Sequence, residues 1–239
     1  YIKDIKTFPD IDSKKVLIKL NVYSGSEAGE KSFIVLKANS WNTEKPGDIG
    51  KKSFRMSLNP GENKIELNYD LGDKAQLWSE FEPVLYKLEV TLKGKNTLDV
   101  VTTDFGMRKF STSGTQFTIN GLKTFLRGKH DACVFPLTGH PPMDVESWRK
   151  VFRIAKSYGI NFYRFHSWTP PEAAFQAADI EGIYMQPELS FWGSFSKDRN
   201  LDLNDYLLKQ GDNILEKYGN HASFVMFALG NELSGDQDV

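Results

Sequence analysis

The chain has 239 residues, of which 40% are hydrophobic and 26% are charged, which is ordinary for a globular protein. This length allows one large domain or two modest ones. A formal net charge of −1 at pH 7 gives no electrostatic basis for binding nucleic acid or an anionic membrane. No apolar stretch approaches the roughly 20 residues of a membrane span. The single cysteine, Cys133, excludes an intrachain disulfide and a cysteine-based metal cluster.

The first part of the chain, to about residue 110, has the two-residue periodicity of β-strands. Val16, Ile18, Leu20 and Val22 alternate with less apolar neighbours, so one face of that segment is expected to be buried. Six further strands are predicted between turn sequences, at 2–8, 32–38, 52–58, 63–69, 84–92 and 97–103. About seven short strands in about 110 residues are typical of an immunoglobulin-like β-sandwich. We expect this domain to span residues 1–110, with Trp41 and Trp78 in its core.

After Phe110 the periodicity changes. Asn120-Gly121 predicts a type I′ hairpin between strands at 116–119 and 122–126. Helical and strand patterns then alternate, which implies parallel strands joined by helices. The predicted helices are 145–158, capped by Asp144, one opened by Pro170-Pro171 and ended near Gly182, and 203–218; the predicted strands are 160–165, 183–189 and 224–229. Residues 111–239 are therefore expected to form the first half, about four strands, of a (β/α)8 TIM barrel. The alternative is a small, open, doubly wound sheet.

In a parallel sheet the carboxyl ends of the strands lie at one edge, where α/β barrels carry out their chemistry. Glu232 follows the apolar run 224–229 and stands at that edge in this interpretation. Carboxylates, imidazoles and indoles together suit a polar, uncharged ligand such as a sugar, because indole faces cover the apolar faces of pyranose rings. The predicted rim residues are His130, Asp131, Arg164, His166, Trp168, Glu188, Trp192, Asn231 and Glu232.

Several of these residues have a structural interpretation beside the functional one. Glu232 is either a general acid/base or a glutamate at a helix N-terminus. Glu188 is either a second catalytic carboxylate or an ion-pair partner of Arg164 or His166, and the ion pair is favoured. His166 is either a substrate donor or a structural histidine, whereas His130 and Asp131 are placed in a loop and His221 at the opposite end of its strand.

The four histidines of the chain lack the spacing of a metal-binding motif. No glycine-rich phosphate-binding loop follows any of the predicted strands. We therefore expect neither a metal nor another cofactor.

Motifs spread over most of the chain resemble those of glycoside hydrolase family 2, the group of β-galactosidases, β-glucuronidases and β-mannosidases. Gly219-Asn220-His221 through Gly230-Asn231-Glu232 is similar to the family's signature around the fourth barrel strand. Its second-strand region is matched by Asn161 to His166 with Pro170, and by Ala178 to Ile183. The other matching stretches are 117–121 with 126–128 at the barrel entrance, and 77–86 and 105–108 in the sandwich.

This resemblance implies a retaining, exo-acting glycosidase with Glu232 as acid/base and Asn231 holding the hydroxyl next to the anomeric carbon. His166 would line the sugar subsite, although many members have Arg-x-x-His where this chain has Arg164-Phe165-His166. Residues 127–131 also depart from the commoner pattern, so the resemblance does not identify the sugar. Arg164, Glu188, Trp192, His130 and Asp131 complete the predicted substrate-binding set.

The family's nucleophile is a second glutamate after the seventh strand, whereas this chain ends after the fourth. We expect a fragment that is inactive alone and self-associates through its open half barrel. The expected partner is an oligosaccharide or β-glycoside, with no nucleic acid and no membrane. Relatives that degrade polysaccharides are often exported, so the periplasm or the cell exterior is favoured over the cytoplasm. The alternative function is a non-catalytic carbohydrate-binding or scaffold protein that works through its sandwich.

Overall fold

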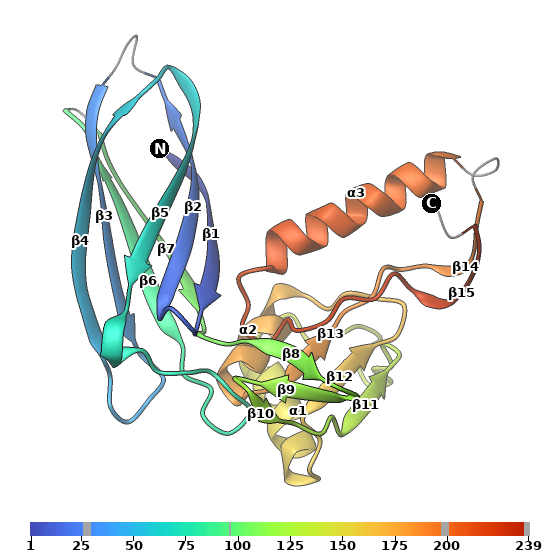
Figure 1. Cartoon of the computed structure of the whole chain (residues 1–239). Coiled ribbons are helices and arrows are strands. Elements are labelled where there is room, and N and C mark those ends of the chain that lie inside the picture. Colours follow the sequence, from blue (N-terminus) through green and yellow to red (C-terminus); the bar gives the residue numbers. More distant parts are fainter. Residues whose placement is uncertain (26–29, 96, 197–200, 237–239) are drawn as a thin grey trace. The chain divides into compact units, whose positions relative to one another are not determined.

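The computed structural model describes residues 1–25, 30–95, 97–196 and 201–236 (Figure 1). The chain divides into two compact units, which are described separately below. Unit 1 contains residues 1–114 and 118–123, and unit 2 contains residues 115–117 and 124–239. In the described part of the chain, no helix is both long and apolar enough to cross a membrane.

Unit 1 is built from two antiparallel sheets, with strand orders β1-β2-β5 and β4-β3-β6-β7. Strand β2 alternates as its sequence predicts, and its four apolar inward side chains are at most 2% exposed. These side chains pack with those of the second sheet in one apolar core, so the predicted sandwich is confirmed. The strands are β1 (Ile2–Asp10), β2 (Lys15–Ser24), β3 (Glu30–Ser40), β4 (Asp48–Leu58), β5 (Gly61–Asp70), β6 (Tyr86–Lys93) and β7 (Leu98–Phe105).

Polar side chains complete the packing of the sandwich. Tyr69 accepts a hydrogen bond from Ala38 N (3.1 Å) and donates one to Gly50 O (2.5 Å), so strand β5 of one sheet is tied to β3 and β4 of the other. Trp78 is fully buried, as predicted, but Trp41 is 41% exposed. The prediction for Trp41 was wrong because this residue follows the end of β3, where its ring lies beside the Lys87 ammonium (5.5 Å).

A small antiparallel sheet follows, with order β10-β9-β8: β8 (Phe110–Ser113), β9 (Gln116–Ile119) and β10 (Leu122–Lys123). Asn120 (φ 52°) and Gly121 (φ 81°) both have left-handed backbones, as the predicted type I′ turn requires. Strand β10 stops at Lys123, and the chain enters the parallel sheet only at β11 (Gly128–Asp131). His130 and Asp131 therefore lie in a strand rather than in the predicted loop.

Unit 2 contains the parallel sheet β11-β12-β13, with β12 at Phe162–Phe165 and β13 at Tyr184–Gln186. Helix α1 (Val145–Ser157) connects β11 to β12, and α2 (Glu172–Glu181) connects β12 to β13. Such an order begins both a (β/α)8 barrel and an open doubly wound sheet. On β12 the buried Tyr163 and Phe165 pack with α1 and α2, so Arg164 lies on the opposite face of the strand.

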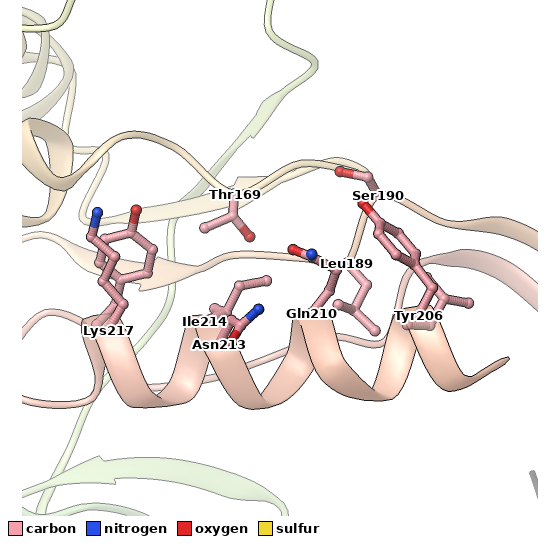
Figure 2. Close-up of a pocket in the computed structure, with 10 residues that line it drawn as sticks. Thr169, Leu189, Ser190, Tyr206, Gln210, Asn213, Ile214 and Lys217 are labelled. Atoms are coloured by element: carbon pink, nitrogen blue, oxygen red, sulfur yellow. The ribbon is translucent and has the colours of Figure 1, made fainter. Parts of the chain in front are cut away.

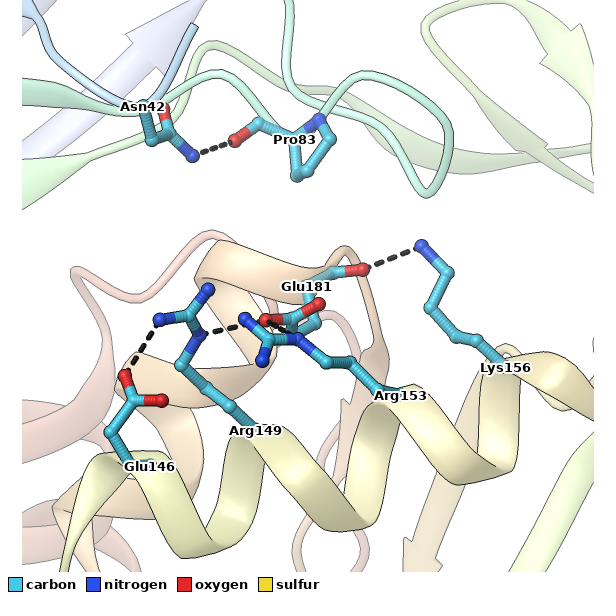
Figure 3. Close-up of polar contacts among 7 residues, drawn as sticks. All are labelled: Asn42, Pro83, Glu146, Arg149, Arg153, Lys156 and Glu181. Atoms are coloured by element: carbon cyan, nitrogen blue, oxygen red, sulfur yellow. Dashed lines mark hydrogen bonds and ion pairs between the residues drawn. The ribbon is translucent and has the colours of Figure 1, made fainter.

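The ends of the helices follow the predicted signals. Asp144 Oδ1 accepts a hydrogen bond from Ser147 N (2.8 Å) at the start of α1, and Gly182 ends α2 with φ 69°. The two helices are also tied to each other by Glu181, whose carboxylate receives Arg149 Nε (2.7 Å) and Arg153 Nε (2.9 Å) (Figure 3).

The region after α3 (Leu201–Tyr218) differs from the prediction. The run 224–229 lies beside 185–189 but makes only isolated parallel bridges, at Phe224 and Ala228. Pro187 interrupts the ladder because it has no N–H to donate, and it accepts a bond from Ala228 N (3.1 Å) instead. The regular strand follows later, as β15 (Asn231–Gly235), which pairs in parallel with an unpredicted strand, β14 (Trp192–Phe195).

Candidate active site

The structure brings the predicted rim residues together in unit 2 as a connected set, although several of them are placed differently from the prediction, including His130 and Asp131, which lie in β11. Glu232 lies inside β15 instead of after a strand, because the regular strand begins seven residues later than Phe224, at Asn231. Trp192 is the first residue of β14 and is paired with Asn231 in the ladder. The remaining members follow or end the parallel strands β11, β12 and β13.

Glu188 is held in a buried ion pair. Its side chain is 0% exposed, and Arg164 Nε reaches Oε1 at 2.5 Å. Ser167 N donates to Oε2 at 2.8 Å, so both carboxylate oxygens are engaged. This is the arrangement that the ion-pair interpretation describes, and it leaves Glu188 without a free oxygen for chemistry.

Arg164 also fixes the side chain of Asn231. Its Nη2 donates to Asn231 Oδ1 at 2.9 Å, and Asn231 is 8% exposed. Because Oδ1 is the acceptor, Nδ2 is directed elsewhere and is available as a donor to a ligand. Asn231, Arg164 and Glu188 thus form one chain of contacts that joins three neighbouring segments.

Glu232 differs from the two other rim carboxylates. Glu188 faces Arg164, and Asp131 faces Lys129 Nζ (2.5 Å). Among the described residues, Glu232 has no cationic partner, and its Oε2 accepts a hydrogen bond from Trp192 Nε1 (2.9 Å). A carboxyl group that is positioned by a neutral donor can hold or release a proton without breaking an ion pair.

The rim also carries a wall of aromatic rings. The His130 and His166 imidazoles are stacked, with centroids 4.6 Å apart and planes at 14°. Trp192 meets His166 edge to face at 5.6 Å, and the Trp192 residue is 62% exposed. An exposed indole beside imidazoles offers an apolar face and polar edges, the combination that suits a sugar ring.

Asp131 joins the ends of β11 and β12. Its main-chain oxygen accepts from His166 N (2.8 Å) and from the Trp168 indole (3.0 Å), and its Oδ1 accepts from Cys133 N (3.1 Å). Asp131 is 4% exposed. The structure therefore gives Asp131 a positioning role for the segment that carries His166.

Strained backbone is concentrated at this rim. Of the five described non-glycine residues with positive φ, three lie here: Cys133 (57°), Ser167 (56°) and Glu232 (48°). Such conformations cost energy and persist where the surroundings enforce them, commonly at functional sites. The backbone is also tightly packed two residues before Glu232, because a Cβ on Gly230 (φ 137°) would lie 2.3 Å from Phe191 O.

Sequence reasoning missed Ser167 and Lys129, which hold Glu188 and Asp131. Nothing but their position beside predicted rim residues signals these roles.

His221 lies away from the rim, as predicted. Its Nδ1 is 2.6 Å from Asp179 Oδ2, and Asp179 Oδ1 accepts from Ser223 N (2.7 Å). Asp179 and Ser223 are buried, so this group ties α2 to the segment before Phe224. In the part of the chain that the structure describes, no group of three or more His, Cys, Asp or Glu side chains could hold a metal ion.

Comparisons with known proteins agree with the predicted kinship. Residues 1–108 match the family model described as Glycosyl hydrolases family 2. Beta-galactosidase 2 of Enterobacter cloacae is 26% identical over 167 residues, which cover 67% of this chain and 16% of that protein. Beta-glucuronidase of Paenibacillus borealis is 24% identical over 252 residues, covering 100% of this chain and 39% of that protein. The resemblance to glycoside hydrolase family 2 is thereby confirmed.

Solved structures extend the likeness beyond residue 108. Bacteroides uniformis beta-glucuronidase 2, covalently bound to cyclophellitol-6-carboxylate aziridine, superposes with a TM-score of 0.80 at 20% identity. The superposition covers 96% of this chain and 28% of that one. At this identity the likeness concerns the fold alone. The chain thus spans well under half of the length of each of these relatives.

Proposed function

We propose that this chain, which is related to glycoside hydrolase family 2 through its residues 1–108, supplies the general acid/base of a retaining, exo-acting β-glycosidase. One observation carries the proposal: Glu232 is the rim carboxylate that an indole N–H positions, while the two others are engaged by cations. Glu232 would protonate the leaving oxygen and later activate the water that releases the sugar.

The neighbouring groups would position the sugar. Asn231 Nδ2 is free to donate because Arg164 occupies Oδ1, so it would hold the hydroxyl next to the anomeric carbon. His166 and Trp192 would cover one face of the ring. The substrate we propose is a terminal β-linked sugar of the β-galactosidase type, since β-galactosidases and β-glucuronidases are the named relatives.

We further propose that residues 111–239 form the first part of a (β/α)8 barrel and that the nucleophile lies outside this segment. A retaining mechanism needs a second carboxylate about 5 Å from the first. Glu188 is a poor candidate because it is fully buried and both of its oxygens are bound. The 239 residues alone are therefore expected to be inactive.

The edge of the parallel sheet supports a proposal about assembly. In the described part of the chain, β11 pairs with β12 on one side only, and an unpaired strand edge is a site for association. We propose that the isolated chain self-associates through this region. Light scattering tests this idea, and a monomer at all concentrations would contradict it.

The catalytic proposal is tested with the protein expressed from its complete gene. Glu232→Gln keeps the shape of the side chain but removes its ability to transfer protons. General acid–base groups contribute about 10²- to 10⁴-fold, so hydrolysis of an alkyl β-galactoside should fall by at least about 10²-fold. The matched control is Glu172→Gln, an exposed glutamate of α2, which should retain full activity. Equal activity of the two variants would refute the assignment.

A further inference from the structure

A polar groove runs along one side of α3, apart from the rim contacts described above. It has a volume of about 330 Å³. One wall is formed by α3 and the other by segments that follow β12 and β13 (Figure 2). Its lining is Thr169, Leu189, Ser190, Tyr206, Leu207, Gln210, Asn213, Ile214, Lys217 and Tyr218.

The helix wall is a row of hydrogen-bonding side chains. Tyr206, Gln210, Asn213 and Lys217 follow one another at intervals of four, three and four residues, so they share one face of α3. At 1.5 Å per residue the row extends for about 16 Å. Figure 2 shows these side chains directed toward the opposite wall. The groove is therefore long enough for more than one sugar ring.

Most of the polar groups in the groove have no internal partner. The side chains of Ser190, Tyr206, Gln210 and Asn213 make no hydrogen bond to any residue that the structure describes. Thr169 and Lys217 are exceptions: the Thr169 hydroxyl donates to Glu188 O (3.0 Å), and Lys217 Nζ lies 3.8 Å from Glu172 Oε2. Two carboxamides and two hydroxyls provide donors and acceptors in one groove, as vicinal hydroxyl groups require.

The apolar base and the charge of the groove further limit the class of ligand that it can bind. Leu189 and Leu207 are 5% and 4% exposed, and together with Ile214 they give the groove an apolar base. Among the described residues that line the groove, Lys217 is the one with a charged side chain, and its ammonium lies 3.8 Å from the Glu172 carboxylate. An apolar base, amide walls and a compensated charge match a neutral pyranose chain better than an anion.

We propose that this groove is a second carbohydrate site, which binds a neutral β-linked oligosaccharide outside the catalytic rim. The inference rests on the proposed function for the class of ligand. It is supported by continuity with the rim, because Leu189 and Ser190 directly follow Glu188, and Thr169 contacts Glu188 through its hydroxyl. A polymer held in the groove would remain close to the segment that carries the ion pair.

The test is an NMR titration of the 239-residue chain with β-1,4-galactotetraose. The side-chain amide signals of Gln210 and Asn213 should shift on addition of the sugar. The Gln210→Ala/Asn213→Ala variant should lose at least about tenfold in affinity, whereas Lys209→Ala, on the same helix but outside the groove, should bind normally. Far-ultraviolet circular dichroism checks that each variant is folded.

The outcomes separate this inference from the catalytic proposal. Glu232→Gln should leave the groove signals responsive, since Glu232 does not line the groove. Shifts confined to Trp192 and Asn231, or no shifts at all, would overturn the proposal that the groove binds the sugar. Tighter binding of an oligogalacturonate of the same length would overturn its preference for a neutral ligand. Shifts in the groove combined with an active Glu232→Gln enzyme would refute the catalytic assignment alone.

Discussion

Replacing Arg164 by methionine is expected to destabilise unit 2 strongly. The change removes the Arg164 contacts to Glu188 (2.5 Å) and to Asn231 (2.9 Å). Glu188 would remain with a side-chain exposure of 0% and no cation, and an unpaired buried charge of this kind costs about 3–5 kcal/mol. At about 4 °C per kcal/mol for a unit of this size, the Tm of unit 2 should fall by about 12 °C or more.

The reverse deletion should cost less. In Glu188→Gln the remaining guanidinium is accessible to water, because the Arg164 side chain is 34% exposed. The loss should then be about 1–2 kcal/mol, the usual cost of a broken hydrogen-bonding pair. The double variant Arg164→Met/Glu188→Gln should be more stable than Arg164→Met, because it leaves no buried charge.

Scanning calorimetry, with hydrogen exchange of β12 and β13 to assign the transition to unit 2, measures these differences. The matched control is Glu172→Gln, which removes an exposed pair with Lys217 and should change stability by less than about 1 kcal/mol. If Arg164→Met changed stability as little as this control, the buried Glu188 carboxylate would not need Arg164 as its counter-charge. The account of the ion pair would then be refuted.

Three further predictions concern the backbone and the titrating groups of unit 2. Gly230→Ala should lower the stability of unit 2 by about 2 kcal/mol or more, because the new Cβ would lie 2.3 Å from Phe191 O. Hydrogen exchange of the β14–β15 amides should become faster in this variant. The control is Gly139→Ala, which also has a positive φ but open space around it, and which should lower the stability by less. The Ser147 N–H lowers the pKa of Asp144 below its ordinary 3.8. The unchanged protein should therefore have a higher Tm than Asp144→Ala above pH 3.8, and this difference should vanish as the pH falls through the lowered pKa. A Tm difference that does not depend on pH would contradict this. Burial raises the pKa of Tyr163 well above its ordinary 10.0. The contribution of Tyr163 to the stability of unit 2 is therefore present below pH 10.0 and is lost as the pH rises toward the raised pKa. Tyr163→Phe should move the alkaline unfolding of unit 2 to higher pH, and an unchanged midpoint would contradict this.

The sandwich and the helices could be predicted because their signals are local. Val16 to Val22 alternate with a period of two, and all four inward positions are buried. Asp144, Gly182 and the Asn120-Gly121 turn act within a few residues of their own position, so a short stretch of sequence is enough to identify them.

The polar pairings of the rim could be predicted only in part, because they join segments far apart in the chain. Arg164 meets Glu188 across 24 residues and Asn231 across 67. The sequence places these residues at one edge of a sheet but does not say which of the carboxylates receives the arginine. The positive φ of Glu232 was not predicted, because residues other than glycine rarely adopt this backbone conformation.

The error in the last strand has a similar origin. The apolar run 224–229 predicts a regular strand, but its partner carries Pro187, which lacks the N–H that a regular ladder requires. The pairing therefore becomes irregular and resumes between β14 and β15.

The claim that Glu232 is the acid catalyst is tested most directly by the leaving-group dependence of kcat/KM in Glu232→Gln. The measurement uses the protein expressed from its complete gene and a series of aryl and alkyl β-galactosides. Loss of the acid should slow substrates with poor leaving groups by at least about 10²-fold and spare those with strongly acidic phenols, which depart without protonation. An equal loss for every leaving group, or no loss for any, would contradict the assignment.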